Sequence, residues 1–192
     1  MKPDPDRRVR RTRRALHDAL LAMMIEKGYD AVTVQDIIDR ADVGRSTFYS
    51  HFTDKADLLQ QGFDNLRALL DQPGPTGPTD PGRPFRFSLP MFQHAQEQRR
   101  LVEALAGRRG GPILEQLERV LAEIVRDELA RLTDRRRTLP VPTDATVRFV
   151  VGAYLAVLNW WLAGPDGYPP ERADEVFQTL VAPGVRAALG QG

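Results

Sequence analysis

The sequence predicts an all-α chain, with a small three-helix domain at its N-terminus and a larger helical domain after it. Apolar residues recur at helical spacing through most of the 192 residues, and no stretch shows the alternation of a half-buried strand. Glycine, proline and helix-capping residues separate the apolar stretches. The composition, with 42% apolar and 28% charged residues, is that of a globular protein.

The N-terminal helices are expected at about residues 10–27, 33–41, 45–52 and 55–72. The first is followed by Gly28, which suits a left-handed C-cap. Thr33 and Asp36 have the spacing of a capping box, so they mark the start of the second helix. A turn at residues 42–44 separates the second helix from the third, and Asp54 precedes the fourth.

A connector rich in proline and glycine follows at residues 73–84. Its five prolines and three glycines exclude a helix or a central strand, so we expect a mobile loop. Further helices are expected at about residues 85–107, 113–137, 143–162 and 170–189. The predicted parts of the chain are therefore a flexible basic arm, the three-helix domain, a connecting helix, the loop and the larger domain, at residues 1–9, 10–54, 55–72, 73–84 and 85–192.

Positive charge is concentrated at the N-terminus. The first fourteen residues carry seven basic and two acidic side chains, a local charge of +5 in a chain of net charge +1. Such a segment can neutralise phosphates and release counterions. A solvated tail would have the same composition, so charge alone leaves both interpretations open.

Residues 33–55 have the pattern of a helix-turn-helix, two short helices joined by a three-residue turn. Phe48 and Phe52 are four residues apart and share the face of the second helix that would pack on the core. The opposite face carries small polar groups, Ser46, Thr47 and Ser50. Arg45 projects from the N-terminal end, where it could donate two hydrogen bonds to guanine. Two helices of an ordinary bundle would show the same spacing.

The same segment resembles the N-terminal DNA-binding domain of the TetR family of bacterial regulators, over about residues 10–59. The residues that carry the resemblance are Gly28-Tyr29, Thr33-Val34, Ala41-Asp42-Val43-Gly44-Arg45-Ser46-Thr47-Phe48-Tyr49, His51-Phe52 and Lys55. The resemblance implies contacts to DNA bases by Arg45, Ser46 and Ser50. It implies contacts to DNA phosphates by Thr33, Thr47, Tyr49, His51 and Lys55.

Three positions depart from the common pattern of the family. Asp42 stands where glycine is frequent in the turn, and aspartate tolerates the left-handed conformation. Gly44 stands where serine often caps the recognition helix, and glycine is an acceptable N-cap. Ser50 replaces a bulkier aromatic residue, which puts its contact to bases in doubt.

For the larger domain, the resemblance implies a ligand-binding and dimerisation role, with the last two helices forming a homodimer. The helix at 143–162 is apolar almost all round, and Gly152 and Ala156 would let a partner helix approach closely. The central helix of a monomer core would look the same. The candidates for lining an effector pocket are Phe87, Met91, Phe92, Tyr154, Asn159, Trp160 and Trp161. A filled core is the alternative for each of them.

Other classes of protein find little support in the sequence. There is no cysteine, so disulfides and thiolate metal sites are excluded, and neither a signal peptide nor a membrane span is expected. The three histidines are scattered and no nucleotide-binding or nucleophile motif is present, so we expect no enzyme, no metal and no cofactor beyond an unknown small-molecule effector. The prediction is a cytoplasmic, ligand-responsive homodimeric repressor that binds a pseudo-palindromic operator in double-stranded DNA. The alternative is a helical protein that binds DNA or a protein partner without a small-molecule switch.

Overall fold

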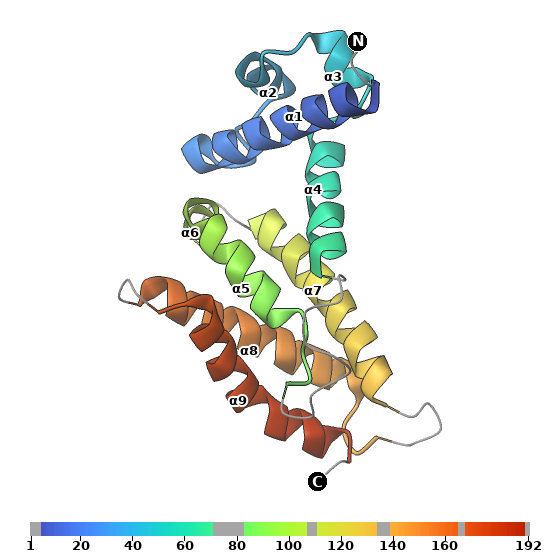
Figure 1. Cartoon of the computed structure of the whole chain (residues 1–192), viewed down its shortest axis with the longest axis vertical. Helices are drawn as coiled ribbons and strands as arrows, with labels where there is room; N and C mark the ends of the chain where they lie inside the picture. The colour runs from blue at the N-terminus through green and yellow to red at the C-terminus, as the bar shows by residue number, and fades with distance from the viewer. Residues whose placement is uncertain (1–4, 71–82, 107–110, 134–138, 165–167, 191–192) are drawn as a thin grey trace. The chain divides into compact units, whose positions relative to one another are not determined.

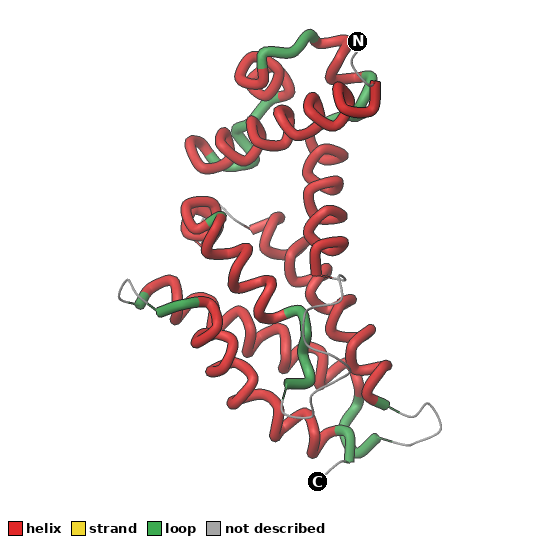
Figure 2. The backbone as a smooth tube through the Cα atoms, in the orientation of Figure 1, coloured by secondary structure: helices red, strands yellow, loops and turns green. Residues whose placement is uncertain are grey.

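The fold was obtained as a computed structural model, which describes residues 5–70, 83–106, 111–133, 139–164 and 168–190. These residues form helices and connecting loops, with no strand among them (Figures 1 and 2). The helices are α1 (Pro5–Lys27), α2 (Val34–Ala41), α3 (Arg45–Tyr49), α4 (Lys55–Leu70), α5 (Ser88–Glu97), α6 (Arg99–Ala106), α7 (Gly111–Leu132), α8 (Thr143–Ala163) and α9 (Pro170–Ala188). The all-α prediction is confirmed.

Helix α1 begins five residues earlier than predicted. Proline is well suited to the first turn of a helix, and Asp6 places a negative charge at the positive end of the helix dipole. Residues 5–9 of the expected arm therefore belong to the helix, while residues 1–4 lie outside the described part of the chain. The helix ends as expected before Gly28, whose φ of 78° is left-handed.

The helix-turn-helix forms as the sequence indicates. Thr33 and Asp36 make both hydrogen bonds of a capping box at the start of α2. Asp42 takes the left-handed conformation in the turn, with φ 53°, and Gly44 is the N-cap of α3. Helix α3 ends at Tyr49, three residues before the predicted end, and residues 50–52 continue as a hydrogen-bonded turn.

The chain divides into two compact units, residues 1–66 with 100–113 and residues 67–99 with 114–192. Helix α4 contributes residues to both units, and α6 is grouped with the first, so this division does not follow the predicted domain boundaries. The core of the first unit includes fully buried side chains from α1 to α4, Leu16, Leu20, Ile37, Phe48 and Leu58.

The second unit is built from α5, α7, α8 and α9, and α9 packs on both α5 and α8 (Figure 1). Its core contains a cluster of aromatic rings, Phe85, Phe87, Phe92, Tyr154, Trp161 and Phe177. The single helix predicted at residues 85–107 is two helices, α5 and α6, which meet at Gln98. Most of the predicted loop at 73–84 and the basic residues at 135–137 lie outside the described part of the chain.

Helix α8 is long and apolar enough to cross a membrane by length and composition alone. Half of its most apolar stretch is buried inside the protein, and a core helix of a soluble protein can have the same length and composition. The feature is thus only weak support for a membrane span, and the sequence analysis expected none.

Candidate functional site

The recognition-helix candidate α3 is anchored by one face and exposes the other. Phe48 is completely buried and its ring lies 5.9 Å from that of Phe52. The side chains of Arg45, Ser46 and Ser50 are exposed on the remaining surface. The structure therefore brings the three predicted base-contacting residues to one accessible, polar helix surface.

Two contacts organise this surface. The guanidinium of Arg45 lies 5.6 Å from the centroid of the exposed Tyr49 ring, a cation–π arrangement. The hydroxyl of Ser50 donates a hydrogen bond of 2.7 Å to the carbonyl of Thr47. Because its only hydrogen is used there, the Ser50 hydroxyl has acceptor capacity left for a base and no donor.

The predicted phosphate-contacting residues are placed differently from one another. Tyr49 is exposed, whereas Thr47 in the middle of α3 and His51 just after its end are partly exposed. The hydroxyl of Thr33 donates a 2.6 Å hydrogen bond to the carboxylate of Asp36. These assignments remain predictions, and for Thr33 the internal bond competes with a phosphate.

The Asp36 carboxylate is held by several donors at once. The ammonium of Lys27 lies 2.7 Å from it, and the backbone N–H of Thr33 donates to it at 2.7 Å. The hydrogen bond from Lys27 is the largest influence that holds the pKa of Asp36 well below its usual range, followed by those from Thr33. The start of α2 is thus fastened to the end of α1 by a carboxylate that stays ionised at neutral pH.

Lys55 is the sequence-predicted residue whose surroundings differ most from the expectation. Its ammonium donates to three backbone carbonyls, those of Tyr29, Asp30 and Val32. A lysine ammonium has three N–H groups, and these acceptors account for all of them. The side chain therefore points into the turn between α1 and α2, and no pattern in the sequence indicates these contacts.

The first half of α1 presents a basic surface. Six exposed arginines lie on it, Arg7, Arg8, Arg10, Arg11, Arg13 and Arg14. The guanidinium of Arg13 lies 5.5 Å from the ring centroid of Phe52, at the end of the helix-turn-helix. Part of the charge that the sequence placed on a flexible arm is therefore held on a helix beside the recognition element.

In the second unit, the structure separates the seven effector-pocket candidates into two groups. Phe87, Phe92, Tyr154 and Trp161 form a connected ring cluster with centroid separations of 4.9–5.6 Å, and Met91 is also buried. Asn159 and Trp160 are exposed, and the ring of Trp160 lies 5.6 Å from that of Tyr168. Asn159 and Trp160 therefore do not lie in the interior, as a pocket lining would require. They lie on the opposite side of α8 from Tyr154 and Trp161.

A buried polar network that sequence reasoning missed surrounds residues 83–88. Asp174 of α9 is 1% exposed and accepts hydrogen bonds from Ser88 and Arg83. The amide nitrogen of Gln178 donates to the carbonyl of Phe85 at 2.6 Å and to the hydroxyl of Ser88 at 2.8 Å. Acidic and amide residues in an amphipathic helix normally lie in solvent, so nothing in the sequence indicated this network.

Glu128 of α7 reaches the same segment from another side. Its Oε1 accepts a 3.1 Å hydrogen bond from the backbone N–H of Arg86. Burial raises the pKa of Glu128 to about 7, and the opposing effects of that bond and of nearby Arg131 are smaller. Within the described residues, three buried oxygens have no hydrogen-bond partner: Glu128 Oε2, Tyr154 Oη and Gln178 Oε1.

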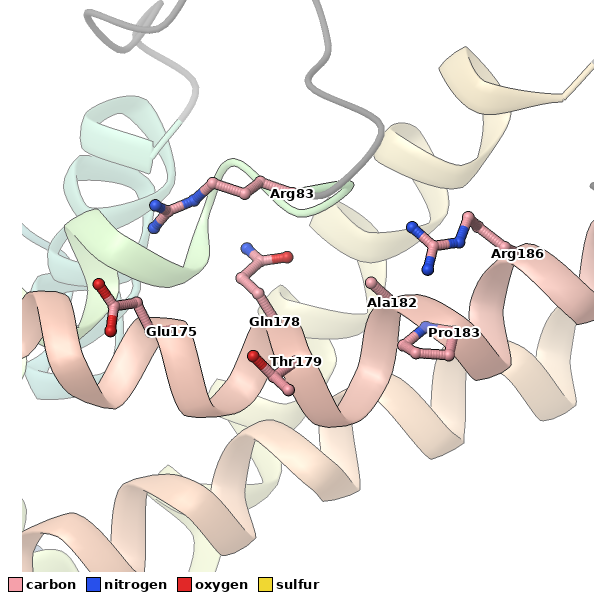
Figure 3. Close-up of a pocket in the computed structure, with 7 residues that line it drawn as sticks. All are labelled: Arg83, Glu175, Gln178, Thr179, Ala182, Pro183 and Arg186. Carbon is pink, nitrogen blue, oxygen red and sulfur yellow. The ribbon is translucent and has the colours of Figure 1, made fainter.

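Gln178 also lines an open groove of about 320 Å³ along α9 (Figure 3). Its lining residues are Arg83, Glu175, Gln178, Thr179, Ala182, Pro183 and Arg186. Figure 3 shows the guanidinium groups of Arg83 and Arg186 on two sides of the Gln178 amide. The described residues contain no group of three acidic or histidine side chains that could hold a metal ion.

The N-terminal part of the chain is similar to a known family of proteins. Residues 16–61, from α1 into α4, match the model described as bacterial regulatory proteins, tetR family. A solved structure of a TetR transcriptional regulator from Streptococcus agalactiae 2603V is 25% identical, with a TM-score of 0.65 over 92% of this chain and 96% of that chain. Residues 16–61 thus form an N-terminal domain of the TetR family type.

The curated relatives with the highest identity are similar mainly to the N-terminal part of the chain. The uncharacterized HTH-type transcriptional regulator YxbF of Bacillus subtilis (strain 168) is 46% identical over 56 residues, 29% of this chain and 15% of the relative. The HTH-type transcriptional repressor KstR of Mycobacterium tuberculosis (strain ATCC 25618 / H37Rv) is 30% identical over 97 residues, 48% of this chain and 44% of the relative. The chain thus spans less than half of the length of these two relatives.

Proposed function

We propose that the chain is a homodimeric transcriptional repressor that binds a pseudo-palindromic operator and responds to a small-molecule effector, and that it acts in the cytoplasm without enzymatic activity. The observation that carries this proposal is α3, whose polar surface with Arg45 is exposed while Phe48 and Phe52 hold its other face in the core. The N-terminal domain of the TetR family type and the name of the relative KstR as a repressor support it.

DNA recognition would divide between two surfaces of the first unit. Arg45 and Ser46 would contact base edges in the major groove, because they lie at the N-terminal end of α3. The arginines of α1, together with Tyr49 and His51, would contact the phosphate backbone. This division makes a clear distinction between residues that determine sequence preference and residues that determine salt dependence.

Dimerisation would use the exposed faces of α8 and α9. Large apolar side chains are exposed there, with Phe149 at 51% and Leu180 at 64%. The ring of Phe149 lies within 3.7 Å of where a side chain at Gly184 would begin, so the exposed apolar surface is continuous across the two helices. A twofold dimer through this face would place two recognition helices on half-sites roughly 34–36 Å apart.

The effector would bind in the second unit, near the aromatic cluster and the polar network at residues 83–88. Buried polar atoms normally have hydrogen-bond partners, so the free oxygens of Glu128 and Tyr154 favour a molecule that donates hydrogen bonds. Arg67 near the end of α4 forms ion pairs with Glu123 and Asp127 of α7. Ligand-dependent movement of α7 would therefore be passed to α4, and α4 begins in the first unit.

Fluorescence anisotropy tests DNA binding directly. The wild-type protein is titrated against DNA from upstream of its own coding region, followed by selection from random DNA if that segment is not bound. We expect tight, salt-sensitive binding that Arg45→Ala weakens and that Arg119→Ala, at an exposed position of α7, leaves unchanged. A folded protein that selects no sequence from the random pool contradicts the proposal and favours a partner-binding role.

The effector is tested with the selected operator. Compounds that release the protein from DNA should also raise its melting temperature, because they bind the folded state. Compounds that raise the melting temperature without changing DNA binding would show that ligand binding does not regulate the protein. That result would support the alternative, a helical protein that binds DNA or a protein partner without a small-molecule switch.

A further inference from the structure

The side chain of Lys55 ends among backbone carbonyls. Lys55 is the first residue of α4, and its Nζ lies 3.0 Å from the carbonyl oxygen of Tyr29, 3.3 Å from that of Asp30 and 2.8 Å from that of Val32. The ammonium also lies 4.5 Å from the centroid of the Tyr29 ring. The three carbonyls use its three donors and the ring adds a cation–π contact, so the charge is fully engaged within the protein.

These contacts join two segments on either side of the recognition element. The carbonyls belong to residues 29–32, immediately before the Thr33 cap of α2, while Lys55 comes shortly after α3 ends. Helix α3 has only five residues, too few to be stable alone, so its position depends on the segments that flank it. An ammonium that fastens the entrance of α2 to the entrance of α4 fixes both flanks together.

We propose that Lys55 is a positioning residue that clamps the turn at residues 29–32 to the start of α4, and that it makes no direct contact with a DNA phosphate. The inference rests on the proposed DNA-binding function and goes beyond it, because the family resemblance implies a phosphate contact for this lysine. The clamp orients α3 through the protein, so its loss lowers the affinity for the operator more than the affinity for unrelated DNA.

The two roles differ in their salt dependence. A side chain that neutralises a phosphate contributes about 0.9 to the slope of log K against log salt concentration. A clamp contributes nothing to that slope, because no counterion is released at Lys55 when DNA binds. The slope therefore separates the two roles even where both variants bind more weakly than wild type.

The experiment compares Lys55→Met and Lys55→Arg on an operator selected with the wild-type protein. Both variants should lose about tenfold or more in operator affinity, with the salt slope and the affinity for unrelated DNA unchanged. Lys55→Arg is the discriminating variant, since a planar guanidinium binds phosphate well but does not direct its donors at three converging carbonyls. Arg119→Met removes one exposed charge from α7, outside the proposed DNA-binding surface, and controls for long-range electrostatics.

A measurement on the wild-type protein tests the clamp without any variant that could unfold. In NMR spectra of protein labelled with ¹⁵N at lysine, the Lys55 ammonium should exchange slowly with water, both in the free protein and with operator bound. Fast exchange in the free protein, or a large change of this signal when DNA is added, overturns the proposal. The proposal is also overturned if the slope of log K against log salt concentration falls by about 0.9 per half-site in the Lys55 variants, or if Lys55→Arg binds the operator like wild type.

The same design separates this proposal from the proposed function. If no operator is found, DNA binding fails as a function, whereas the exchange of the Lys55 ammonium in the free protein still reports on the clamp. If the operator is bound but the ammonium exchanges fast, the function stands and the clamp is wrong.

Discussion

Glu128 gives the stability of the protein a pH dependence whose sign is opposite to that of most carboxylates. Its pKa is about 7 in the folded protein and 4.5 in the absence of burial, so between these values the folded state binds more protons than the unfolded state. The stabilisation is fully present below pH 4.5 and is lost as pH rises through 7. A difference of this size corresponds to about 3 kcal/mol, as an order of magnitude.

The perturbation that isolates this effect is Glu128→Gln. Glutamine keeps an oxygen that can accept the hydrogen bond from the N–H of Arg86, and it has no charge to desolvate at high pH. We expect the variant to match the wild type near pH 5 and to exceed its free energy of unfolding by roughly 1–3 kcal/mol at pH 8.

The assay is urea unfolding at fixed protein concentration from pH 4.5 to 8.5, because a dimer makes apparent stability depend on concentration. His94 acts in the opposite direction, since burial lowers its pKa and favours the folded state as pH rises. The difference between wild type and variant removes that contribution. Glu118→Gln, at an exposed position of the same helix, should leave the pH profile unchanged. Parallel profiles for wild type and Glu128→Gln would refute the reasoning.

Three further predictions concern the recognition surface, the turn and the dimer face. Arg45→Ala should cost about 1–3 kcal/mol per half-site and relax sequence preference, and unchanged preference in a binding selection would remove Arg45 from base recognition. Asp42→Gly should raise the free energy of unfolding by up to about 1 kcal/mol, because Asp42 has φ 53°, and thermal melts against Asp42→Ala check the sign. Leu180→Glu should shift the protein from dimer to monomer in light scattering, whereas Thr179→Glu, one position along α9, serves as the charge control.

The parts of the fold that depend on neighbours in sequence were predictable. The capping box joins residues three apart, and the Gly28 cap and the turn at Asp42 follow from the conformations their side chains allow. The end of α3 was predicted three residues too late, because residues 50–52 continue with helix-like hydrogen bonds and apolar spacing extends to Phe52. Local rules identify an element more reliably than its last turn.

Contacts between residues distant in sequence could not be predicted in the same way. Lys55 donates to carbonyls more than twenty positions earlier in the chain. Every residue has a backbone carbonyl, so the residue types do not show which carbonyls accept these hydrogen bonds. Asn159 and Trp160 were placed in the interior because α8 is apolar on nearly every side, so composition did not tell which face is covered. Only the fold showed that Trp161 is inside and Trp160 is outside.

Helix α7 connects the buried network to α4 through adjacent residues. Glu128 holds the backbone of Arg86, while Asp127, the preceding residue on α7, pairs with Arg67 of α4 at 2.9 Å. Successive residues of a helix point about 100° apart, so a rotation or shift of α7 changes both contacts at once. A molecule that supplied a donor to the free Oε2 of Glu128 would favour its ionised form and alter the hold of α7 on residues 86–88. The ion pairs of Arg67 with α7 would carry that change to the C-terminal end of α4.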